Sequence, residues 1–133
     1  MNFTLYIWLG EKMKTDNVIV EKSKKFAIRI IKLYKYLCDN KNEYVISKQL
    51  LRSGTSVGAN VKEAIRGQSK ADFIAKMNIA LKEASETEYW LDLLYESEYI
   101  TKEQFESIIL DCRELLKLLV SIIKSSKKGE NNS

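Results

Sequence analysis

The sequence predicts an all-α protein that folds as an antiparallel, up-down four-helix bundle. Three observations lead to this fold class. The chain of 133 residues contains no proline and only five glycines, so little in it interrupts a helix. Apolar residues recur every three or four positions through four long segments, which is the period of one helix face. The connections between these segments are short and polar, and short connections favour antiparallel neighbours.

The first helix is predicted from about Asn17 to Cys38. One side carries two apolar rows, and the opposite side carries a basic row. The basic row consists of Lys22, Lys25, Arg29, Lys32 and Lys35. Residues 1–16 are expected to form a non-core N-terminal extension. Its apolar run, Phe3–Leu9, is too short to span a bilayer and lacks the flanking residues of a signal peptide.

The second helix is predicted from near Glu43 to about Arg66, with Gly67 as its C-cap. Gly54 and Gly58 lie one turn apart on the same side of this helix. Each interior glycine costs about 1 kcal/mol relative to alanine, so a compensating interaction is expected. We predict that another helix packs closely over the two glycines.

Capping patterns mark the start of the last two helices. Ser69 with Asp72 predicts a third helix that reaches Glu98, and Thr101 with Gln104 predicts the start of the fourth. The fourth helix has an apolar seam spaced three and four residues apart. The seam is Phe105, Ile108, Cys112, Leu115, Leu119 and Ile122. The bundle should therefore span residues 17–125, followed by a disordered polar tail, residues 126–133.

Charge is divided unevenly along the chain. Residues 14–70 contain 13 Lys and Arg against 5 Asp and Glu, whereas residues 71–114 contain 4 against 11. A basic and an acidic half in one small domain suggest self-association, an anionic partner, or both. An inter-subunit acidic face is expected at Glu83, Glu86, Glu88 and Asp92.

No set of residues predicts a reaction. Histidine is absent, which removes the usual general base and the usual zinc ligand, so no catalytic residue, metal or cofactor is predicted. The segment GTSVG does not follow a strand and lacks the lysine of a phosphate-binding loop. Cys38 and Cys112 fall on apolar helix faces, which indicates reduced thiols and a cytoplasmic location.

The second helix also carries a recognisable motif. Between Gln49 and Asn60 it reads QLLRSGTSVGAN, followed by Glu63 and Gly67. In these residues, and in the Phe, small-residue middle and Glu-x-Glu of the third helix, the chain resembles a bacterial four-helix-bundle family. This family was first noticed as reading frames within intervening sequences of 23S ribosomal RNA genes. Family members often have proline where Gly58 stands. The motif residues are Gln49, Arg52, Ser53, Gly54, Ser56, Gly58, Asn60, Glu63 and Gly67.

The resemblance implies a homopentamer. It also implies a relationship to accessory variability proteins of diversity-generating retroelements, which bind nucleic acid and a reverse transcriptase. We therefore predict a non-enzymatic oligomeric scaffold that binds RNA, DNA or a nucleic-acid-processing partner through the basic row. The alternative is a purely structural self-assembling bundle, or a regulator of a protein partner, without nucleic-acid binding. No membrane and no small-molecule substrate is expected. The basic row itself fits a solvated face, a contact with an acidic neighbouring subunit, or a phosphate-binding surface.

Overall fold

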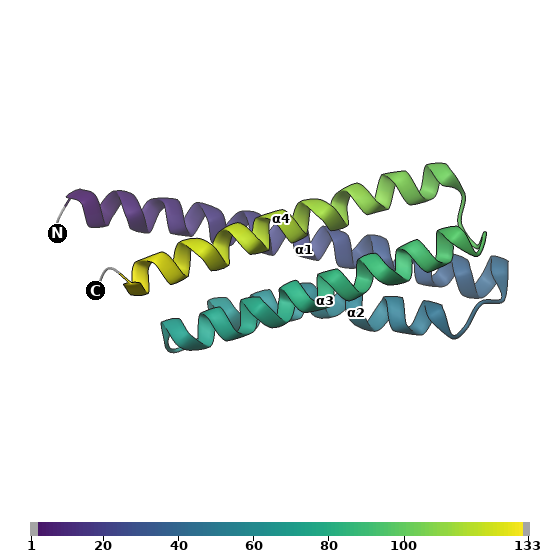
Figure 1. The fold of residues 1–133 in the computed structure, drawn as a ribbon, viewed down its shortest axis with the longest axis horizontal. Helices are drawn as coiled ribbons and strands as arrows, with labels where there is room; N and C mark the ends of the chain where they lie inside the picture. The colour runs from purple at the N-terminus through teal and green to yellow at the C-terminus, as the bar shows by residue number, and fades with distance from the viewer. Residues whose placement is uncertain (1–2, 132–133) are drawn as a thin grey trace.

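The computed structural model describes the backbone of residues 3–131 and the side chains of residues 12–128. It confirms the all-α fold class, with four helices and no strand in that range. The helices are α1 (Phe3–Lys41), α2 (Ile46–Ile65), α3 (Lys70–Glu96) and α4 (Lys102–Asn131). They run alternately up and down, so the first and last helical turns of the chain lie at the same end (Figure 1).

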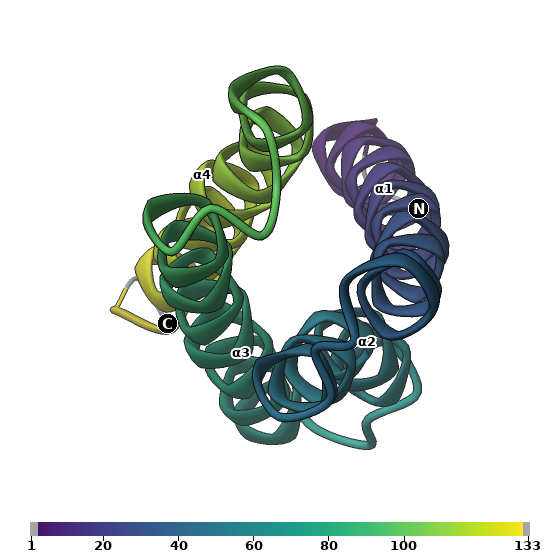
Figure 2. The same ribbon diagram turned by 90° about the vertical axis from the view of Figure 1, so that its right-hand side faces the viewer.

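Each helix packs against two others around a common core. Viewed end-on, α1 is followed around the bundle by α2, α3 and α4 (Figure 2). The α1–α4 interface is the smallest of the four. Every helix contributes fully buried side chains, among them Phe26, Leu50, Leu91 and Leu119. The predicted seam of α4 lies in this core, and Phe105 at its start stacks on Tyr95 of α3 with ring centroids 4.5 Å apart.

Several helix boundaries differ from the sequence-based expectation. α1 begins at Phe3 rather than near Asn17, because no proline or capping residue stops the helix from continuing. Within residues 12–41 of this helix, the first fully buried side chain is nevertheless Ile19. α4 continues to Asn131, where a disordered tail from residue 126 was expected. Its last turns hold several lysines, which favour the negative end of a helix dipole. α3 ends at Glu96, two residues before the expected end.

The predicted caps of α3 and α4 are confirmed. The Ser69 side chain accepts a hydrogen bond from the Asp72 N–H at 3.1 Å. At α4 the exchange is reciprocal. The Gln104 N–H donates to the Thr101 hydroxyl at 3.1 Å, and the Thr101 N–H donates to the Gln104 side-chain oxygen at 2.8 Å. Each pair satisfies backbone donors that a helix start leaves without partners.

The α1–α2 turn is built around a buried carboxylate. α2 begins at Ile46 rather than Glu43, because Glu43 caps the helix from outside. Its carboxylate accepts hydrogen bonds from the N–H groups of Val45 (3.1 Å), Ile46 (2.9 Å) and Ser47 (2.6 Å). Burial alone would raise the pKa of Glu43, but these backbone donors and the Ser47 hydroxyl hold that pKa below its ordinary value of 4.5. The turn before it holds Asn42 at a positive φ of 52°.

Gly54 and Gly58 of α2 both lie against α1, and Gly54 lies closer to it than Gly58 does. A Cβ atom on Gly54 would come within 2.8 Å of the Cγ1 and Cγ2 atoms of the fully buried Ile30. A Cβ atom on Gly58 would lie 3.4 Å from the Ser23 backbone oxygen, an ordinary contact distance. Gly54 therefore allows the closer approach of the two helices. Gly67 does not adopt the positive φ of a C-cap glycine. Instead, its N–H donates to the Ala64 carbonyl at 3.0 Å.

Candidate nucleic-acid interface

The basic row of α1 lies beside α4, and two of its five members are paired with carboxylates of that helix. Lys22 Nζ lies 2.5 Å from Glu114 Oε1, and Arg29 Nη1 lies 2.5 Å from Asp111 Oδ2. The hydrogen bond and the negative charge of Glu114 raise the pKa of Lys22. The sequence left three interpretations of this row open: a solvated face, a contact with an acidic neighbouring subunit, or a phosphate-binding surface. These two cations instead pair with acids of the same chain, because the angular position of α4 brings those acids to α1.

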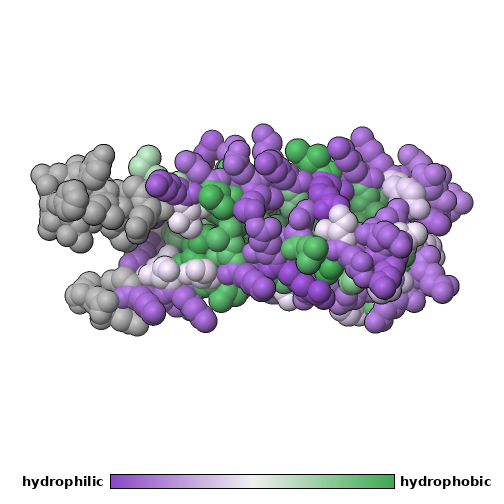
Figure 3. All heavy atoms as spheres, turned by 90° about the horizontal axis from the view of Figure 1, so that it is seen from above, coloured by the Kyte–Doolittle hydropathy of each residue, from purple (hydrophilic) through white to green (hydrophobic). Residues whose placement is uncertain are grey.

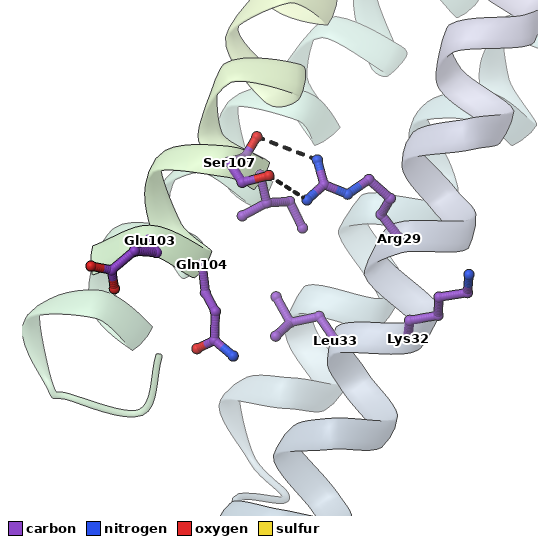
Figure 4. Close-up of a pocket in the computed structure, with 7 residues that line it drawn as sticks. Arg29, Lys32, Leu33, Glu103, Gln104 and Ser107 are labelled. Atoms are coloured by element: carbon purple, nitrogen blue, oxygen red, sulfur yellow. Dashed lines mark hydrogen bonds between the residues drawn. The ribbon is translucent and has the colours of Figure 1, made fainter. Parts of the chain in front are cut away.

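Arg29 spans the α1–α4 interface with three contacts. Besides Asp111, its guanidinium donates to the Ser107 hydroxyl at 2.9 Å and to the Ser107 carbonyl at 3.3 Å (Figure 4). These bonds fix the plane of the guanidinium between the two helices. Arg29 therefore helps to join α1 to α4, and its charge is partly neutralised there.

The other three members of the row remain exposed. Lys25, Lys32 and Lys35 make no ion pair within the side chains that the structure describes, and all three are exposed to solvent. In Figure 4, Lys32 points away from the Arg29–Ser107 contact. Three long cationic side chains on one helix, without carboxylate partners, are the part of the row that can bind an external anion.

A shallow groove runs beside these residues between α1 and α4. Its volume is about 510 Å³, and its apolar lining is Leu33 and Ile108. Its polar lining is Arg29, Lys32, Glu103, Gln104 and Ser107. The Gln104 side chain turns toward the groove (Figure 4), and its oxygen is occupied by the Thr101 N–H. A smaller hollow of about 110 Å³ adjoins Lys22 and Lys25. The groove therefore places two cations, Arg29 and Lys32, beside an apolar floor, with one carboxylate, Glu103, on its α4 side.

The motif residues of α2 make contacts within the chain. Facing the core, the Thr87 hydroxyl donates to the Ser53 hydroxyl at 2.9 Å, a buried bond that joins α3 to α2. Asn60 donates to the Ser56 carbonyl of its own helix at 2.9 Å, and Ser56 in turn donates to the Arg52 carbonyl at 2.6 Å. Gln49 is exposed. These contacts fit a role in helix packing.

Most of the expected inter-subunit acidic face is paired inside the chain. Arg52 of α2 contacts Glu83 at 3.1 Å and also Glu86, and Arg113 of α4 contacts Glu88 at 3.1 Å. Glu63 of the α2 motif likewise pairs within the chain and lies 2.9 Å from Lys76 of α3. Of the four acidic residues, only Asp92 has no ion pair among the described side chains. Sequence spacing alone does not show which faces of two helices meet, so these pairs were not foreseen.

The described residues contain no cluster that could bind a metal ion, and both of their cysteines are free thiols. No group of three or more His, Cys, Asp or Glu side chains there is placed to hold a metal ion. Both cysteines are free, and burial raises the pKa of the Cys112 thiol to about 12. Cys38 is half-buried, with its sulfur 3.9 Å from the Ser47 hydroxyl. No helix in the described part of the chain is long and apolar enough to cross a membrane.

Comparison with known proteins shows a matching family and a similar solved structure. A family described as "23S rRNA-intervening sequence protein" matches residues 15–121. The fold is similar to a crystal structure from Bacteroides thetaiotaomicron, a protein with unknown function from the S23 ribosomal protein family. The TM-score is 0.82 at 63% sequence identity, and the match covers 83% of this chain and 98% of that one. No curated protein matches the sequence.

Proposed function

Because the chain belongs to the 23S rRNA-intervening sequence protein family, we propose that it is a non-enzymatic, self-assembling scaffold that binds nucleic-acid phosphates through α1. The observation that carries this proposal is that Lys25, Lys32 and Lys35 are exposed and make no ion pair with any side chain of residues 12–128. Cations of this kind neutralise phosphates and release condensed counterions, which supplies affinity without reading sequence. Several copies in one assembly would add many weak contacts.

The proposed assembly is a head-to-tail ring, with five subunits favoured. Such a ring needs two different and complementary faces on each subunit. On α1, Ile28 (44% exposed) and Ile31 (38% exposed) lie among lysines. The second face includes Tyr89 (55% exposed) on α3, the helix that carries Asp92 and Glu96, and Leu110 (67% exposed) on α4. Exposed apolar side chains between charges of opposite sign support a contact between these faces.

The nucleic-acid role is tested by changing Lys25, Lys32 and Lys35 to glutamate together. Arg29 is left unchanged, because its loss would also break the contacts with Asp111 and Ser107. The wild type should bind RNA and duplex DNA with little sequence preference. Its affinity should fall steeply between about 50 and 200 mM salt, and the variant should lose binding at both ends of that range. Fluorescence anisotropy measures the affinity of the wild type and of the variant, and circular dichroism checks that the variant is folded.

A matched control makes the same change of net charge at three lysines outside α1. Lys48, Lys62 and Lys70 are exposed and lie on α2 and at the start of α3, so their triple replacement by glutamate should retain binding. Equal loss in both triple variants would mean that only net charge matters. If the wild type fails to bind even at 50 mM salt, the second candidate applies, which is assembly or protein-partner binding without nucleic acid. The exposed apolar residues of α1, α3 and α4 favour that candidate.

Self-assembly is tested separately by light scattering. The wild type should have a mass near five protomers, and Leu110→Glu should reduce it because a carboxylate would then oppose an apolar contact. Val45→Glu serves as the control, since Val45 is 75% exposed at the α1–α2 turn, away from the proposed faces. A wild-type monomer at micromolar concentration in low salt would contradict the ring.

A further inference from the structure

The second half of α4 carries a row of cations that α1 does not neutralise. Between Leu115 and Lys128 the chain has four lysines and no aspartate or glutamate. Three of them, Lys117, Lys124 and Lys128, form one face of the helix and are called the α4 lysine stripe. With Ser121 and Ser125 between them, they line a shallow groove of about 350 Å³. All five side chains are exposed.

The α4 lysine stripe differs from the basic row of α1 in the carboxylates that lie near it. Lys117, Lys124 and Lys128 make no ion pair among the described side chains. On the N-terminal side of the stripe, the nearest acids along α4 are Glu114 and Asp111, and both are already paired with α1 cations. Lys22 and Arg29 of the basic row thus have their counter-charges inside the protein, whereas no described carboxylate pairs with a lysine of the stripe. An external anion meets a higher positive potential at the stripe.

We propose that the α4 lysine stripe is a second surface that binds the phosphate backbone of nucleic acid. The inference rests on the proposed nucleic-acid role and adds a site to it. Eleven residues of helix place the outer lysines about 16 Å apart along α4. At 3.4 Å per nucleotide along one duplex strand, this length faces about five phosphates. The Ser121 and Ser125 hydroxyls lie on the same face and supply uncharged hydrogen-bond donors to phosphate oxygens.

The geometry favours a nucleic acid over a lipid surface as the partner. A basic amphipathic helix binds membranes by inserting its apolar face, but the apolar face of α4 is buried in the core through Leu115, Leu119 and Ile122. The stripe and the basic row lie on adjacent helices. Figure 3 views the side of the molecule formed by α1 and α4, and hydrophilic side chains cover most of it. One extended polyanion can therefore contact both helices.

The test replaces Lys117, Lys124 and Lys128 with glutamate in the full chain and measures RNA and duplex DNA binding by anisotropy. Binding at about 100 mM salt should weaken by about tenfold or more. The log–log salt dependence should become shallower by about 2 to 3, since each lost contact removes 0.7 to 0.9. Replacement by glutamine should produce the same change in slope with a smaller loss of affinity. Thermal melting followed by circular dichroism shows whether each variant is folded.

The outcomes separate this inference from the proposed function. If the α4 variant binds like the wild type while the α1 triple variant loses binding, the inference is wrong and the proposed function stands. If the Lys48, Lys62 and Lys70 control loses as much affinity as the α4 variant, net charge explains the effect and the inference is overturned. Absence of any wild-type binding overturns both. Binding of the wild type to anionic vesicles alone would identify the stripe as a lipid contact and would also overturn it.

Discussion

Replacing Gly54 with leucine should destabilise the bundle by about 3 kcal/mol, at the upper end of the usual cost of overpacking a core. Even the first added atom is obstructed, because a Cβ at this position would lie 2.8 Å from two carbons of Ile30. Ile30 is fully buried, so it cannot move aside without disturbing its own neighbours. Gly54→Ala should therefore also destabilise, despite the better helix propensity of alanine. Urea denaturation measures both changes.

Gly58 supplies the comparison for this prediction. A Cβ there would make an ordinary contact of 3.4 Å with Ser23, so Gly58→Ala should gain helix propensity and stabilise by up to about 1 kcal/mol. Ile30→Ala removes both obstructing carbons next to Gly54, Cγ1 and Cγ2. Combined with Gly54→Ala, it should cost less than the sum of the two single changes. Strict additivity, or equal effects at the two glycines, would contradict the described approach of α1 and α2.

Glu43→Ala should cost about 2 kcal/mol, because three backbone N–H groups lose a charged acceptor at the start of α2. Asp39→Ala is the control at the same end of the bundle. Asp39 is exposed and makes no ion pair among the described side chains, so its loss should change stability by less than about 0.5 kcal/mol. Urea denaturation at neutral pH compares the two variants.

The contribution of Glu43 to stability should also depend on pH, and its lowered pKa fixes the direction of that dependence. Its pKa in the folded protein is lowered from 4.5, so its stabilising contribution is complete above about pH 5. The contribution is lost as pH falls through the lower folded-state pKa. The stability difference between the wild type and Glu43→Gln should therefore be constant near neutrality and shrink below pH 4.5. A difference that grows on acidification would contradict the capping role.

The spacing of apolar residues was sufficient to predict the fold, because a buried helix face is encoded by residues only a few positions apart. The apolar seam of α4, the Ser69 cap and the reciprocal Thr101–Gln104 cap all depend on residues a few positions apart, and all were found. The glycines of α2 also gave a correct indication of close packing. Their helical spacing did not show which of them meets a side chain and which meets backbone.

The candidate site was harder to predict, because its electrostatics depend on contacts between distant segments. Lys22 and Glu114 are 92 positions apart, and Arg29 and Asp111 are 82 apart. Whether they meet depends on the rotation of α1 and α4 about their axes, which apolar spacing constrains only roughly. Glu43 was missed for a related reason. Its capping role follows from the backbone path through Asn42, and no short sequence pattern encodes that path.

The small α1–α4 interface has a consequence for how the bundle moves. No turn joins these two helices, whereas each of the other three interfaces connects neighbours in sequence and forms with a short loop closure. Besides core packing, the α1–α4 interface has exposed ion pairs, each worth at most about 1 kcal/mol and weakened by salt. Partial opening should therefore begin there. The two ends of the chain would separate first, while α2 and α3 stay together through Arg52 and the buried Ser53–Thr87 bond.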